Sequence, residues 1–159
     1  MRLSPPLRQQ RDRDAIRAGL RDGTIDALVS DHTPVDADAK NLPFAQAEPG
    51  ASAVELLLGL TLKWAQQERI ALPQALATVT SRPVAVFGGA LDRIAPGAGK
   101  LAVGAAADLC VFDAAAFGPV NAGTLVSRAK YTPFAGTELP GRVAYTLVGG
   151  QTAFEARAR

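Results

Sequence analysis

The stretch "IDALVSDHTPVDADAK", residues 25–40, decides which fold this sequence is expected to adopt. Its short apolar run, IDALVS, is typical of a buried strand and ends directly before Asp31 and His32, the only histidine of the chain. The preceding segment predicts a helix, because Ile16 and Leu20 are four residues apart and Gly23 is placed to end it. A helix followed by a buried strand with a polar residue at its carboxyl end is how α/β barrels present their active sites.

The rest of the sequence predicts two units, one mainly helical and one made of strands. Residues 32–50 form a long loop rich in proline, aspartate and alanine, and loops of this length are usually functional or mobile. Apolar helices are expected at 51–70 and at 73–88. From residue 99 on, β-branched and aromatic runs indicate strands, and the pair Gly149 and Gly150 indicates a hairpin turn. We therefore expect an α/β unit at 1–98 and a small β unit at 99–159.

Composition narrows the class of protein. The 159 residues suffice for one domain or parts of two, and 48% hydrophobic with 20% charged residues is typical of a globular protein. Arginines near the start alternate with aspartates, which favours a solvated helix face over a nucleic-acid surface. The sequence shows neither a signal peptide nor a membrane span. The single cysteine, Cys110, lies in an apolar run, so we expect a buried thiol in a reducing cytoplasm.

Five motifs together carry a resemblance to a known family. They occur in the order SPPLR (4–8), DGTIDALVSDHTP (22–34), LPF (42–44), ADLCVFD (107–113) and YTPFAGTELPGRVAYTLVGGQ (131–151). This order resembles the carboxyl-terminal portion of a dihydroorotase, a cyclic amidohydrolase of the amidohydrolase superfamily. The resemblance implies an α/β fold in which residues 1–98 are the last helix-strand-helix units of a (β/α)8 metal-dependent hydrolase barrel. Residues 99–159 would then be strands of a small composite β-sandwich.

The resemblance also implies a set of site residues. Asp31 is expected to contact the metal and to accept a proton from the attacking hydroxide, while His32 supports the loop. The implied substrate-binding positions are Ser4, Arg8, Val35, Phe44 and Ala45. Three of them depart from the family, which has asparagine, histidine and glycine where this chain has serine, valine and alanine. The implied cofactor is zinc, but one histidine in the whole chain cannot complete a dinuclear zinc site.

Several functions follow from the resemblance. The first is a dihydroorotase, which interconverts dihydroorotate and carbamoyl aspartate in pyrimidine biosynthesis. The second is a non-catalytic dihydroorotase-like subunit that supports the assembly of aspartate transcarbamoylase, and a weaker alternative is an allantoinase or dihydropyrimidinase relative. In each case we expect a cytoplasmic oligomer that acts on a small molecule and binds neither nucleic acid nor membrane.

Four local expectations can be compared directly with a structure. Lys40 and Lys130 are expected to be solvated, and Glu55 is expected to tether a loop or lie at the edge of the core. The loop at 34–49 is expected to fold over the site as a lid that carries Phe44 towards the substrate. If most of the barrel is missing, apolar side chains that it would cover should face water or a partner, namely Leu28, Leu57 and Leu60.

Overall fold

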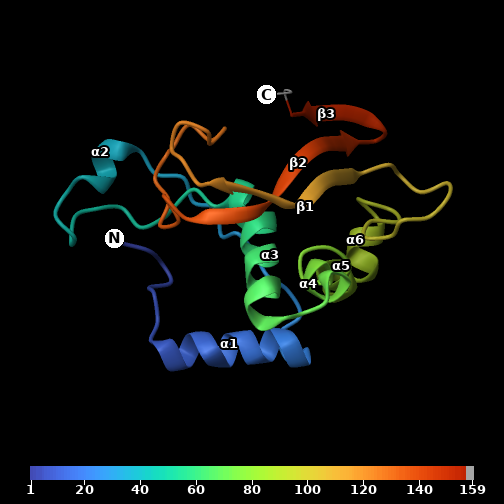
Figure 1. Cartoon of the computed structure of the whole chain (residues 1–159), viewed down its shortest axis with the longest axis horizontal. Coiled ribbons are helices and arrows are strands. Elements are labelled where there is room, and N and C mark those ends of the chain that lie inside the picture. Colours follow the sequence, from blue (N-terminus) through green and yellow to red (C-terminus); the bar gives the residue numbers. More distant parts are fainter. Residues whose placement is uncertain (157–159) are drawn as a thin grey trace.

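The computed structural model describes residues 1–156, which form a group of helices followed by one antiparallel sheet (Figure 1). The sheet lies on one side of the central helix α3 and the first helix, α1, on the other. The helices are α1 (Gln10–Asp22), α2 (Ala37–Lys40), the 3₁₀ turn η1 (Val54–Leu56), α3 (Leu57–Glu68), α4 (Leu72–Ala77), α5 (Ser81–Phe87) and α6 (Gly89–Asp92). The strands are β1 (Leu109–Pro119), β2 (Glu138–Val148) and β3 (Gln151–Glu155). Within the described residues, no helix is long and apolar enough to cross a bilayer.

Helix α1 forms where the sequence predicts it. A capping box between Gln9 and Asp12 satisfies backbone donors at its start, and Gly23 ends it with φ of 87°, a left-handed conformation that glycine adopts without strain. Leu20 is the buried contact of α1 with a first core cluster that also contains Trp64 of α3 and Ala75 of α4. The helix is fixed to the rest of the chain by this apolar contact and by the ion pair of Arg17 with Glu68 at 3.2 Å.

The strand predicted at 25–30 is not formed. Residues 26–36 belong to neither a helix nor a strand. Between 26 and 30 the one backbone hydrogen bond among the described residues runs from the N–H of Leu28 to the carbonyl of Thr78, at 3.0 Å. A β-strand forms only when its backbone is hydrogen-bonded to a neighbouring strand. Without such a neighbour, the N–H and C=O groups of this apolar segment have no strand partner. The segment is still held from the side, because Ile25 and Leu28 pack against the first core cluster.

The carboxyl-terminal sheet confirms the predicted hairpin. Strand β2 pairs antiparallel with both β1 and β3, and the β2–β3 turn uses Gly149 and Gly150 at φ of 56° and 79°. Two positive φ values in a row are the requirement of the tight turn that joins twisted strands. Cys110 lies on β1 and is exposed, so the expectation of a buried thiol was wrong. Since β1 is an edge strand of the sheet, an apolar sequence there does not guarantee that its side chains are buried.

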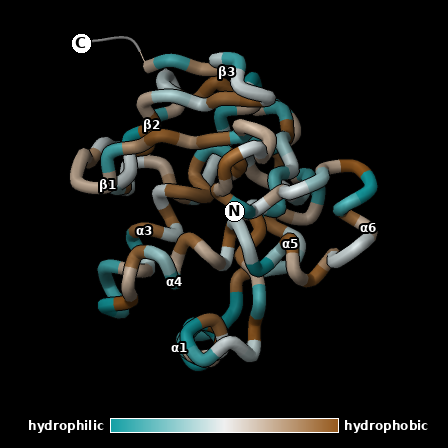
Figure 2. Tube along the Cα trace, turned by 90° about the vertical axis from the view of Figure 1, so that its right-hand side faces the viewer, coloured by the Kyte–Doolittle hydropathy of each residue, from teal (hydrophilic) through white to brown (hydrophobic). Residues whose placement is uncertain are grey.

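Helix α3 packs directly on β2, and two glycines permit the close approach. A Cβ on Gly59 would lie 3.1 Å from the carbonyl oxygen of Pro140, and a Cβ on Gly141 would collide with Leu62. The second core cluster lies beside this contact and consists of Leu56, Val120, Leu125 and Leu139, with Leu60 and Phe134 packed against it. Figure 2 shows hydrophobic stretches on the strands and on the helices beneath them.

Candidate functional site

The turn at Asp31 forms one wall of a small cavity. Asp31 is exposed and has φ of 44°, a left-handed conformation that aspartate tolerates better than most residues. The N–H of Thr33 donates to the carbonyl of Ala51 at 3.0 Å and anchors the turn. The cavity has a volume of about 190 Å³, and its lining includes Ser4, Asp31, Thr33, Ala51, Ala53, Pro133 and Phe134. The structure thus brings together two of the predicted residues, Ser4 and Asp31.

His32 holds the start of a helix. Its Nδ1 atom accepts hydrogen bonds from the N–H groups of Ala53, at 3.0 Å, and Val54, at 3.3 Å. These donors lie at the beginning of η1, where helical N–H groups have no partner within the helix. An Nδ1 that accepts two hydrogen bonds has its lone pair engaged, so the ring proton is on Nε2. The geometry agrees with a supporting role for this histidine.

The other predicted substrate-binding residues do not line this cavity. Arg8 pairs with Asp12 at 3.7 Å, and its side chain is exposed. Val35 is buried at 6% exposure and lies beside Gly50. Phe44 is 68% exposed and the carbonyl of Ala45 accepts a hydrogen bond from Arg2. Their roles in binding substrate remain predictions from the family motif.

Lys40 fixes the long loop in place, which corrects the expectation that it is solvated. Its Nζ donates to the carbonyls of Arg2, at 2.9 Å, and Glu48, at 2.6 Å, and lies 4.6 Å from the ring centroid of Tyr131. Desolvation, with the nearby guanidinium of Arg2, lowers the pKa of Lys40. Lys130 is exposed, as expected, although its ammonium group also donates to a backbone carbonyl.

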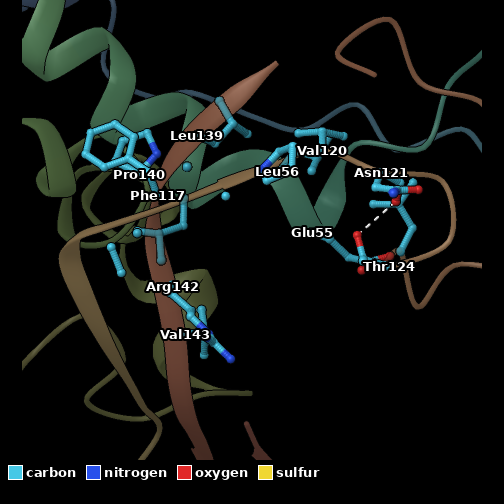
Figure 3. Close-up of a pocket in the computed structure, with 17 residues that line it drawn as sticks. Glu55, Leu56, Phe117, Val120, Asn121, Thr124, Leu139, Pro140, Arg142 and Val143 are labelled. Carbon is cyan, nitrogen blue, oxygen red and sulfur yellow. Dashed lines mark hydrogen bonds between the residues drawn. The ribbon is translucent and has the colours of Figure 1, made fainter. Parts of the chain in front are cut away.

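Glu55 ties two distant segments together. Its carboxylate accepts the N–H of Val126 at 2.8 Å and that of Ser127 at 2.7 Å, which agrees with a loop-tethering carboxylate. A larger cavity of about 460 Å³ opens beside it (Figure 3). In this view Glu55 and Thr124 lie to the right and Arg142 to the lower left, while Leu56 and Leu139 lie above them. Sequence reasoning did not foresee this cavity, since its walls come from α3, β1, β2 and the loop between the strands.

Metal ligands do not converge in the part of the chain that the structure describes. No group of three or more histidine, cysteine, aspartate or glutamate side chains lies close enough to hold a metal ion. Structural and catalytic zinc sites need at least three protein ligands around one point. Asp31 can offer one carboxylate, and the lone pair of His32 Nδ1 is engaged with backbone donors. Residues 1–156 by themselves do not fit the dinuclear zinc site that the resemblance implies.

Comparison with known proteins identifies the family. The amidohydrolase family model matches residues 4–153. A dihydroorotase-like protein from Pseudomonas aeruginosa is 43% identical over 154 residues, which are 96% of this chain and 34% of that protein. A dihydroorotase from Citrifermentans bemidjiense is 39% identical over 155 residues, covering 98% of this chain and 35% of that protein. The solved D-hydantoinase (dihydropyrimidinase) from Thermus sp. matches with a TM-score of 0.85 at 28% identity. The match covers 97% of this chain and 33% of that protein.

The chain therefore belongs to the amidohydrolase family, and its α/β arrangement is an amidohydrolase-family fold. Its sequence is similar to dihydroorotases and dihydroorotase-like proteins along nearly its whole length. The chain spans about a third of the length of the curated relatives it matches.

Pro133 and Phe134 are the site residues that sequence reasoning missed. Both belong to the motif YTPFAG, which contributes to the family resemblance but was assigned only to the β unit. In the structure they line the same cavity as Asp31. The signal was present in the motif, yet a linear reading could not show that residues a hundred positions apart share one cavity.

Proposed function

We propose that this chain supplies the Asp31 part of a dihydroorotase-type cyclic amide hydrolase that interconverts dihydroorotate and carbamoyl aspartate. The observation that carries the proposal is that Asp31 and Ser4 line one cavity, in a chain similar to dihydroorotases over nearly all its residues. On this proposal, residues 1–98 are the last units of a (β/α)8 barrel and residues 99–159 are strands of a composite β-sandwich. Ile25 and its successors would become a strand when neighbouring strands are supplied.

Asp31 would act as the general base and then as the general acid. Hydrolysis of a cyclic amide forms a bond between a water oxygen and the carbonyl carbon and breaks the bond from that carbon to nitrogen. The carboxylate would accept the proton of the water and return it to the departing nitrogen, so the residue ends in its starting state. Zinc is the family expectation, and most of its ligands would come from residues other than those described.

A second candidate function is a non-catalytic, dihydroorotase-like subunit that supports assembly of aspartate transcarbamoylase. Two observations favour it. Val35 is buried where the family motif has a substrate-binding histidine, and Ser4 stands where the motif has asparagine. Losing two charge-assisted hydrogen bonds, each worth about 1.5–3 kcal/mol, would weaken substrate binding by orders of magnitude. The relatives include a Pseudomonas protein named dihydroorotase-like rather than dihydroorotase.

The solved neighbours named hydantoinase and dihydropyrimidinase keep a third candidate open. Sequence identity to them is 28% and 25%, lower than the 39% to a dihydroorotase. We therefore rank hydrolysis of dihydropyrimidines or hydantoins behind that of dihydroorotate.

Complementation in trans tests these candidates. The 159-residue chain is mixed with the amino-terminal two thirds of a similar dihydroorotase in the presence of zinc, and hydrolysis of dihydroorotate, dihydrouracil and hydantoin is measured. We expect a soluble complex that hydrolyses dihydroorotate, while the chain alone has no activity and holds no stoichiometric zinc. Asp31→Asn should lower the rate by about 100-fold or more. Asp26→Asn, an exposed aspartate five residues earlier, is the matched control and should leave the rate unchanged.

The outcomes separate the proposals. Turnover by the chain alone would overturn the idea that the chain lacks a complete site. A stable complex without turnover, together with binding to aspartate transcarbamoylase, would favour the non-catalytic subunit. Turnover of hydantoin but not of dihydroorotate would favour the third candidate.

A further inference from the structure

Residues 51–55 connect to the Asp31 turn by three hydrogen bonds. The carbonyl of Ala51 accepts the N–H of Thr33 at 3.0 Å. The N–H groups of Ala53 and Val54 donate to Nδ1 of His32 at 3.0 and 3.3 Å. The turn therefore depends on where this short segment lies, and not only on the residues next to it in sequence.

The same segment also binds the loop between β1 and β2. The N–H of Ser52 donates to the carbonyl of Tyr131 at 2.8 Å, and its hydroxyl donates to the carbonyl of Ala129 at 2.6 Å. Ser52 is 2% exposed, so these hydrogen bonds are shielded from water. Glu55 adds two charge-assisted bonds to the N–H groups of Val126 and Ser127. Residues 51, 53 and 54 thus contact the Asp31 turn, whereas residues 52 and 55 contact the loop between β1 and β2.

The loop that is held in this way continues into the cavity wall. Pro133 and Phe134 lie two and three residues after Tyr131 and line the same cavity as Asp31. Phe134 also packs against the second core cluster, which fixes the far side of the wall. Segment 51–55 therefore holds hydrogen bonds both to the Asp31 turn and to the loop at 126–131, and both neighbouring stretches line the cavity.

We propose that Glu55 is a positioning residue for the Asp31 cavity, acting through segment 51–55 on the Asp31 turn and through the strand-connecting loop on Pro133 and Phe134. The meaning of this role for catalysis rests on the proposed function of Asp31. The coupling itself does not rest on that function, because it concerns only the dependence of two sets of backbone contacts on the Glu55 carboxylate.

Residue-resolved amide hydrogen exchange tests the coupling on the full chain. Glu55→Ala removes both acceptors, whereas Glu55→Gln keeps the size of the side chain and one acceptor oxygen. Asp92→Ala removes a carboxylate from an exposed position of α6 and is the control. We expect Glu55→Ala to accelerate exchange roughly tenfold or more at Val126 and Ser127, and also at Thr33 and Ala53. Glu55→Gln should have an intermediate effect, and the control should have none.

The decisive comparison is between the two sets of amides. Acceleration at Val126 and Ser127 with unchanged exchange at Thr33 and Ala53 would overturn the proposal, since Glu55 would then tether the loop alone. Equal acceleration at every protected amide would also overturn it, because it would report global destabilisation. If Glu55→Ala does not fold, the same comparison is made with Glu55→Gln.

An activity measurement links the coupling to function. In the complemented enzyme, Glu55→Gln should raise KM or lower kcat while the unfolding midpoint stays near that of the parent. If no combination has activity, the proposed function fails and the exchange experiment still decides the coupling.

Discussion

Gly141→Ala tests the contact between β2 and α3, the helix that follows segment 51–55 in the chain. Gly141 has φ of 92°, and an added Cβ would collide with Leu62 of α3. A left-handed backbone costs an L-residue about 1–2 kcal/mol, and overpacking a close contact typically costs about 1–3 kcal/mol. The free energy of unfolding should therefore fall by about 2–5 kcal/mol. Trp64, the only tryptophan, is 7% exposed in the first core cluster, so its fluorescence reports unfolding in urea.

Gly23→Ala separates the two contributions. Gly23 has φ of 87°, and a Cβ there would meet no atom within 4 Å. This variant should lose only the backbone part, about 1–2 kcal/mol. If Gly141→Ala costs no more than Gly23→Ala, the packing of α3 on β2 does not depend on the glycine, and the reasoning is refuted.

Two further predictions concern the ends of helices. His32→Ala leaves two N–H groups at the start of η1 without their acceptor. The free energy of unfolding, measured in urea, should fall by about 0.5–2 kcal/mol, the usual cost of a lost cap. An unchanged midpoint would contradict the capping role. The N–H of Thr24 donates to the carboxylate of Asp22 at 2.9 Å and lowers the pKa of that carboxyl. The stabilisation from this hydrogen bond is present above the unfolded-state pKa of about 3.9. It is lost as the pH falls through the lower pKa of the folded state. Asp22→Ala should lower the Tm at pH 6 and lose this effect towards pH 2, and a difference that is constant with pH would argue against it.

Local sequence patterns predicted those features whose causes are local. Helix α1 was expected from the spacing of Ile16 and Leu20 and from Gly23, and Gly23 lies directly at the end that it determines. The β2–β3 hairpin is determined by two adjacent glycines in the same way. Loop tethering by Glu55 was expected in kind, although its partners, 71 and 72 residues away, could not be named from the sequence.

Features that depend on distant partners were predicted poorly. Lys40 was expected in solvent because a lysine in a polar loop usually is, but its partners are the carbonyl of Arg2 and the ring of Tyr131. Leu28 and Leu60 were expected to face water or a partner, and both pack against core clusters within the chain. Burial is a sum over neighbours in space, and a linear pattern shows only neighbours in sequence.

The segment at 25–30 shows why a correct motif can accompany a wrong element. Its apolar residues predict a buried strand, and their side chains do find apolar neighbours, since Ile25 and Leu28 reach the first core cluster. Its backbone finds no ladder, because strand pairing needs a second strand at the right distance and register. Asp31 nevertheless lies in the cavity, as its turn is anchored by residues 51–54 and not by a sheet. The turn at Asp31 is thus held in place by residues 51–54, although the strand from which its place was inferred is not formed.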